Sequence, residues 1–196
     1  MVKICGLMTA ADVDAAVGAG ANAVGFVFAE SVRRVTPDEA ATAARRIPEG
    51  VLRVAVMKHP NNDEWRAVFD GFGPDVLQTD TEDFAALDVP DSVRRWPVYR
   101  EGRDADPDTM PAEFLYDGAR SGSGETVDWR RAQSVARQGR MILAGGLSAA
   151  NVGAAIATVK PWGVDTSSGV ESAPGVKDPD RISAFIKAAR AAEQTL

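Results

Sequence analysis

The chain has 196 residues, of which 45% are hydrophobic and 26% charged, a composition typical of a globular protein and a length that fits one domain. The net charge is −6, with no block of lysine or arginine, which argues against broad binding to nucleic acid or to anionic membranes. A single cysteine excludes an intrachain disulfide and a cysteine-based zinc site. Because no apolar run reaches the roughly 20 residues that span a bilayer, we expect a cytoplasmic protein.

Short apolar runs alternate along the chain with segments of helical periodicity, as expected of repeated strand–helix units around a parallel sheet. The predicted strands are residues 2–5, 23–28, 51–57, 75–78, 95–99, 114–117, 141–144 and 163–166. Helix starts follow most of these strands, at residues 9–12, Thr36-Pro37, Asp128, Ser148 and Asp178-Pro179.

The middle of the chain follows this pattern less closely. Thr81 is a candidate cap for a short helix, and Pro97 weakens the predicted fifth strand. Residues 100–113 are polar and interrupted by proline, which favours a short irregular connection over a full crossover helix. Eight units, one of them shortened, favour an α/β fold of the closed barrel class over an open doubly wound sheet. We expect residues 1–196 to form a single compact (β/α)8 TIM barrel domain with an abbreviated fifth helix.

Two glycine-rich loops follow the seventh and eighth predicted strands, where barrels of this class bind phosphate. Gly145 and Gly146 lie in the first loop, and Ser167, Ser168 and Gly169 lie in the second. Glycine lets backbone N–H groups approach an anion closely, and serine hydroxyls donate hydrogen bonds. In either loop alone the glycines could serve only a sharp turn, but two such loops in consecutive places favour phosphate binding.

Two ionisable residues end strands at the same predicted rim of the barrel. Cys5 could act as a base in a region of positive potential, although a lone cysteine is by default a small buried apolar side chain. Asp117 could donate a proton if burial keeps it protonated, or it could cap a helix or loop. Arg33 could hold a carboxylate in two parallel hydrogen bonds, although surface arginines are common. We assign His59, which follows the third strand, no role.

Several segments of the sequence are distinctive when taken together. They are residues 3–7 (KICGL), 25–28 (GFVF), 122–124 (GSG) with Asp128-Trp129, 144–147 (AGGL) and 164–171 (VDTSSGVE), followed by Pro174-Gly175 and Lys177-Asp178. This set closely resembles the phosphoribosylanthranilate isomerase family. The resemblance runs from Lys3 to the final predicted helix, and its opening and last two loops are its most specific parts.

The resemblance implies the Amadori rearrangement of N-(5-phosphoribosyl)anthranilate to 1-(2-carboxyphenylamino)-1-deoxyribulose 5-phosphate in tryptophan biosynthesis, without a cofactor. Asp117 matches the general acid that opens the ribose ring, and Cys5 matches the general base that removes the C2′ proton. Arg33 matches the arginine that holds the anthranilate carboxylate, and Asp165 matches an acidic residue lining the site. The two glycine-rich loops match the phosphate site.

Two alternatives stay open. One is a related barrel isomerase of another phosphorylated aminoaldose, in the histidine pathway or acting on both substrates, although such enzymes carry aspartate where Cys5 stands. The other is a non-catalytic protein that binds a phosphorylated ligand. The sequence departs from the family pattern after strands three and four, at Lys58-His59 and at Asp80, which stands in place of a substrate-lining histidine. We expect a small phosphorylated substrate, no metal, no nucleic-acid or membrane partner, and a monomer.

Overall fold

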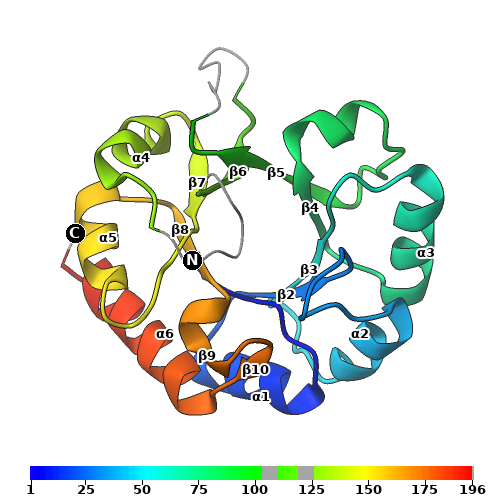
Figure 1. Ribbon diagram of the computed structural model, residues 1–196, viewed down its shortest axis with the longest axis horizontal. Coiled ribbons are helices and arrows are strands. Elements are labelled where there is room, and N and C mark those ends of the chain that lie inside the picture. The colour runs from blue at the N-terminus through cyan, green and yellow to red at the C-terminus, as the bar shows by residue number, and fades with distance from the viewer. Residues whose placement is uncertain (103–109, 119–125, 196) are drawn as a thin grey trace.

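The computed structural model describes residues 1–102, 110–118 and 126–195. Eight parallel strands pair in chain order, and β1 pairs with β8 to close the barrel, around which the helices form an outer ring (Figure 1). The strands are β1 (Val2–Cys5), β2 (Ala23–Val27), β3 (Leu52–Val56), β4 (Val76–Asp80), β5 (Arg94–Arg100), β6 (Glu113–Asp117), β7 (Arg140–Leu143) and β8 (Gly163–Thr166). The predicted fold class is confirmed.

The helices begin where their capping residues allow. They are α1 (Ala10–Ala19), α2 (Pro37–Ala43), α3 (Asn62–Phe72), α4 (Trp129–Ala136), α5 (Val152–Val159) and α6 (Pro179–Glu193). Thr9 and Thr36 form the predicted caps, and the side chains of Asp128 and Asp178 accept hydrogen bonds from the first turns of α4 and α6. The predicted start at Ser148 is wrong by four residues, because the Asn151 side chain accepts a bond from the Ser148 N–H at 2.8 Å and holds a turn before α5.

The fourth unit has a short 3-10 helix, η1 (Thr81–Ala85), in place of an α-helix. Thr81 does not cap it, because this residue is already inside the helix and its hydroxyl donates to the Val98 carbonyl at 3.1 Å. Pro97 lies within β5 and faces Thr79 in β4, with the register intact on both sides. Residues 101–102 and 110–112 of the fifth connection contain no helix, and residues 103–109, where an abbreviated helix was expected, lie outside the described residues.

The barrel interior is apolar at one end and ionisable at the other. An inner core of eight buried residues fills the middle: Ala23, Val54, Val76, Trp96, Val98, Leu115, Ile142 and Ala144. Side chains alternate along a strand, so residues two positions further on face inward as well. By this rule Asp117 follows Leu115, and Arg100 follows Val98 and pairs in register with Asp117. The interior therefore changes from apolar to charged toward the carboxyl ends of the strands.

A larger apolar cluster lies between the strands and the helices, and it seals the outside of the barrel. It includes Phe26 and Phe72, whose rings meet edge to face with centroids 5.0 Å apart. Each fully buried side chain of this size contributes about 1.5–3 kcal/mol of hydrophobic stabilisation. This stabilisation offsets the free-energy cost of burying ionisable groups inside the barrel. None of the helices in the described ranges combines the length and apolar character that crossing a bilayer needs.

Candidate active site

Ionisable side chains at the mouth of the barrel form two groups, and Asp117 of β6 lies outside both. The inner cluster comes from β1, β8, the loop after β2 and the β9–β10 hairpin (Glu171–Ala173 and Val176–Lys177), and consists of Lys3, Cys5, Arg33, Asp165, Glu171 and Lys177. The rim cluster comes from the loop after β3, the end of β4, η1 and the end of β5, and consists of His59, Asp80, Asp83 and Arg100.

Cys5 lies buried at the end of β1, as predicted, and shares the inner face of that strand with Lys3. The Lys3 ammonium group has no exposed surface and donates to Asp165 Oδ1 at 2.9 Å across the β1–β8 closure. Burial raises the pKa of the Cys5 thiol, Lys3 and Lys177 act to lower it, and the net result is a raised pKa. The thiolate therefore depends on cations held inside the barrel.

Glu171 organises the other half of the inner cluster. Arg33 donates to both carboxylate oxygens, from Nε at 2.7 Å and from Nη2 at 2.8 Å, and Lys177 Nζ donates to Oε1 at 2.7 Å. Burial opposes ionisation of Glu171, but these hydrogen bonds outweigh it and lower the pKa of the carboxyl group to about 2. Lys177 also donates to the carbonyl and the hydroxyl of Ser167, so this ion pair is joined to the loop after β8.

The structure places Arg33 at the mouth, where two of its guanidinium nitrogens donate hydrogen bonds to Glu171. Nη1 is the nitrogen that lies outside this bidentate pair. Gly6, in a left-handed conformation with φ 71°, leaves the space that Arg33 and Ser167 occupy, since a Cβ atom at Gly6 would lie 2.6 Å from Arg33 Cδ. The opening motif of the sequence thus makes room for side chains from two other loops.

The two glycine-rich loops lie against each other, as their consecutive places in the barrel predict. Gly145 and Gly146 both have positive φ angles, 88° and 59°, which favour glycine. A Cβ atom at Gly169 would lie 2.0 Å from the Leu147 carbonyl oxygen, and the Thr166 hydroxyl donates to that same oxygen at 2.7 Å. The loops after β7 and β8 therefore form one continuous backbone surface next to Ser167.

Asp117 lies half-buried at the end of β6, and its Oδ1 accepts a hydrogen bond from the Gly118 N–H at 2.8 Å. It stands in register with Arg100 of β5, so both side chains face the interior of the mouth. The Gly122-Ser123-Gly124 segment of the family resemblance falls in residues 119–125, outside the described residues.

The rim cluster was not predicted. Arg100 Nη2 donates to Asp80 Oδ1 at 2.6 Å, while the His59 ring lies between Asp80 at 3.4 Å and Asp83 at 3.0 Å. His59 has a positive φ of 47°, and its N–H donates to Asp83 at 3.1 Å. The ring and the two carboxylates present ligand atoms within 4.8 Å of one another, but each is already engaged in these contacts. Sequence spacing gave no signal, because the cluster joins segments at and after the ends of three strands.

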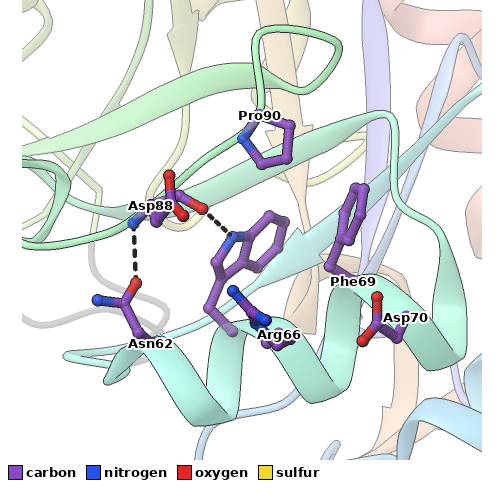
Figure 2. A pocket seen from close by; sticks show the side chains of 7 residues that line it. Asn62, Arg66, Phe69, Asp70, Asp88 and Pro90 are labelled. Carbon is purple, nitrogen blue, oxygen red and sulfur yellow. Dashed lines mark hydrogen bonds between the residues drawn. The ribbon is translucent and has the colours of Figure 1, made fainter.

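Two hollows are lined by residues outside the inner cluster. The loops after β2 and β3 enclose a cavity of about 970 Å³ whose lining includes Phe28, Met57 and His59. The other, of about 160 Å³, lies between α3 and the segment that carries Asp88 and Pro90 (Figure 2). There Trp65 Nε1 donates to the Asp88 carbonyl at 3.2 Å, and the Asp88 N–H donates to the Asn62 side chain at 2.8 Å (Figure 2). These bonds tie α3 to the segment before β5, and we assign the small hollow a structural role.

A closed barrel of eight parallel strands with ionisable side chains gathered at the carboxyl ends of those strands defines a (β/α)8 barrel enzyme. Residues 2–188 match the family model described as N-(5′-phosphoribosyl)anthranilate (PRA) isomerase, and the chain belongs to that family. The predicted family and activity, PRA isomerisation in tryptophan biosynthesis, are thereby confirmed.

Full-length relatives agree with this assignment. The chain is 42% identical to the N-(5′-phosphoribosyl)anthranilate isomerase of Listeria monocytogenes over 211 residues, covering 98% of this chain and all of the relative. It matches a crystal structure of phosphoribosylanthranilate isomerase in complex with reduced 1-(o-carboxyphenylamino)-1-deoxyribulose 5-phosphate, at a TM-score of 0.78 and 29% identity, covering 97% and 98% of the two chains. Monomeric forms of the dimeric Thermotoga maritima enzyme match with a TM-score of 0.80 and 30% identity, with the same coverage.

Proposed function

We propose that Cys5 is the general base and Asp117 the general acid of the PRA isomerase reaction. The observation that carries this is their placement: each is the last residue of its strand and faces inward at the carboxyl mouth of the barrel. Asp117 gives its proton to the ribose ring oxygen as the C1′–O bond breaks, which leaves a protonated Schiff base. The Cys5 thiolate then takes the C2′ proton, and the electrons of that C–H bond form the enolamine double bond. Tautomerisation gives the ketone, so the reaction moves protons only and needs no cofactor.

We propose that the loops after β7 and β8 hold the substrate phosphate through Gly145, Gly146, Ser167, Ser168 and Gly169. Three features support this: the positive φ angles of the paired glycines, the close approach at Gly169, and the Lys177 contact that fixes Ser167. A solved relative binds a ligand that carries a 5-phosphate.

We propose that Arg33 holds the anthranilate carboxylate and that Asp165 lines the site. The bidentate pair with Glu171 fixes the plane of the Arg33 guanidinium group, so that Nη1 is presented in one orientation. Asp165 reaches the interior through its ion pair with Lys3, below the Cys5 thiol. The substrate carries both a phosphate and a carboxylate, for which the glycine-rich loops and the Arg33 guanidinium group are the two proposed partners.

We also propose that residues 1–196 act as one catalytic domain and as a cytoplasmic monomer that binds neither metal nor nucleic acid. The pairing of β1 with β8 supports a single domain, because it joins the first and last strands of the barrel in one sheet. Light scattering on the purified protein tests the monomer directly: a mass near 20.7 kDa supports it, and twice that mass contradicts it.

The test of the acid and base roles is turnover of PRA made in situ from anthranilate and phosphoribosyl pyrophosphate, followed by loss of its fluorescence. The parent should turn over, and Cys5→Ser and Asp117→Asn should each lose activity by about 10²–10⁴-fold while keeping the circular dichroism spectrum of the parent. Turnover that survives either substitution would remove that residue from the mechanism.

A further inference from the structure

Lys3 is a fully buried lysine that the proposed mechanism does not use. Its side chain has no exposed surface, and its ammonium group is paired with Asp165 at 2.9 Å. A buried ion pair is often no more stabilising than well-packed apolar residues of the same size, so stability alone gives little reason for a lysine here. The presence of a charge inside the barrel needs another explanation.

The geometry directs Lys3 toward Cys5. Both residues face inward from β1, two positions apart, and Cys5 stands in register with Gly25 of β2. A Cβ atom at Gly25 would lie 3.0 Å from Cys5 Sγ and 3.3 Å from Lys3 Cε, so the two side chains converge on the space that this glycine leaves open. The Lys3 ammonium group also acts electrostatically on the Cys5 thiol and lowers its pKa.

The second buried lysine near Cys5 is engaged differently. An ammonium group has three N–H donors, and Lys177 directs them to Glu171 Oε1 at 2.7 Å and to the Ser167 carbonyl and hydroxyl at 2.9 and 3.2 Å. Lys177 therefore serves the loop after β8. Lys3 donates to Asp165, and its side chain converges with the Cys5 thiol at the space beside Gly25.

We propose that Lys3 is a positioning residue for the isomerisation: its buried ammonium group is the counter-charge of the Cys5 thiolate, and Asp165 holds it in place. This inference rests on the proposed role of Cys5 as the general base. Lys3 has no contact with the substrate in this account and acts through the thiolate alone.

Four charged groups interact electrostatically with Cys5: Lys3 from β1, Asp165 from β8, Lys177 from β10 and Arg33 from the loop after β2. Burial raises the pKa of the thiol most strongly, Lys3 opposes it more than any other charge, Asp165 raises it, and Lys177 lowers it less than Lys3 does. Removal of the Lys3 charge should therefore raise the pKa of the thiol more than removal of the Lys177 charge.

The test uses the one cysteine of the chain as its own reporter. Thiolate absorbance near 240 nm is titrated against pH in the parent and in Lys3→Met, Lys3→Arg and Lys177→Met, with Cys5→Ser as the blank. We expect Lys3→Met to move the thiolate midpoint upward by about one pH unit, with Lys3→Arg closer to the parent and Lys177→Met moved less. The rising limb of kcat against pH should move with it, so kcat near neutral pH falls about tenfold.

Lys3→Met leaves Asp165 buried without its partner, so a double variant, Lys3→Met with Asp165→Asn, removes both charges together. Its thiolate midpoint should lie between those of the parent and of Lys3→Met. A midpoint in Lys3→Met and in the double variant that coincides with the parent's would overturn the inference. Failure of the proposed function gives a different result, because parental turnover would then survive Cys5→Ser whatever the thiol titration shows.

Discussion

The inner and rim clusters contain the same kinds of ion pair in different surroundings. Lys3 and Glu171 of the inner cluster are almost fully enclosed, and so is Asp80 of the rim cluster, but the His59 side chain that contacts Asp80 and Asp83 is 54% exposed. Solvent screens the contacts of an exposed pair and leaves them worth little, while an enclosed charge acts strongly on its neighbours. The comparison teaches that position in the barrel, more than the list of residue types, separates groups that tune chemistry from groups that fix a loop.

Substitution of Asp117 should give the largest effect and sharpen this comparison. Asp117→Asn removes the proposed proton donor while keeping the side-chain shape, so kcat should fall about 10²–10⁴-fold with a smaller change in KM. Asp83→Asn is the matched carboxylate-to-amide change in the rim cluster and should stay close to the parent. Steady-state kinetics compares the two, and equal losses would show that the rim cluster matters to the reaction as much as the proposed acid does.

Glu171→Gln tests how strongly enclosure acts on stability. The pKa of Glu171 is lowered to about 2, so its carboxylate adds stability above its ordinary pKa of 4.5 that is lost as pH falls toward 2. We expect the variant to lose on the order of 3 kcal/mol at pH 7 in urea unfolding, with the gap closing below pH 4.5. If the difference in free energy of unfolding between the parent and the variant does not change with pH, the ionised carboxylate is not the source of that difference.

Gly169→Ala tests the close approach of the two phosphate loops. The added methyl group would meet the Leu147 carbonyl oxygen at 2.0 Å, so one loop must move, and KM should rise about tenfold. Gly153→Ala is the matched control. A Cβ atom added at Gly153 in α5 would meet only Ala192 of α6, at 4.0 Å. A parental KM in Gly169→Ala would separate these loops from substrate binding.

The smallest effect is expected at His59. His59→Asn keeps a residue that tolerates a positive φ and removes the ring contacts with Asp80 and Asp83. Since these contacts are half-exposed, the free energy of unfolding should fall by less than about 1 kcal/mol and kcat should stay close to the parent. A loss of kcat comparable to that of Asp117→Asn would place the rim cluster in the reaction.

The strand order and most helix starts could be predicted because they depend on local signals. Thr36 and Asp128 cap their helices through bonds to residues two or three positions away, so a short window contains the whole interaction. The prediction that Thr81 caps a helix failed for the opposite reason. Its hydroxyl donates to the Val98 carbonyl, 17 residues further along, and a short window does not contain that partner.

The candidate site could be predicted in part for the same physical reason. Cys5 and Asp117 end strands, and the barrel brings strand ends together without further information. The pairing of Lys3 with Asp165 spans 162 positions and depends on the β1–β8 register, which sequence periodicity does not fix. Residue type alone also did not reveal that both carboxylate oxygens of Glu171 accept hydrogen bonds from Arg33.

The most direct test of the central claim compares two titrations of the parent protein. If the Cys5 thiolate is the base, the rising limb of kcat/KM against pH reports its ionisation in the free enzyme. We predict that this limb coincides with the thiolate absorbance titration and that both lie above the ordinary cysteine pKa, because burial raises it. A rising limb that lies well below the thiolate titration, with Cys5→Ser keeping the same profile, would contradict the account.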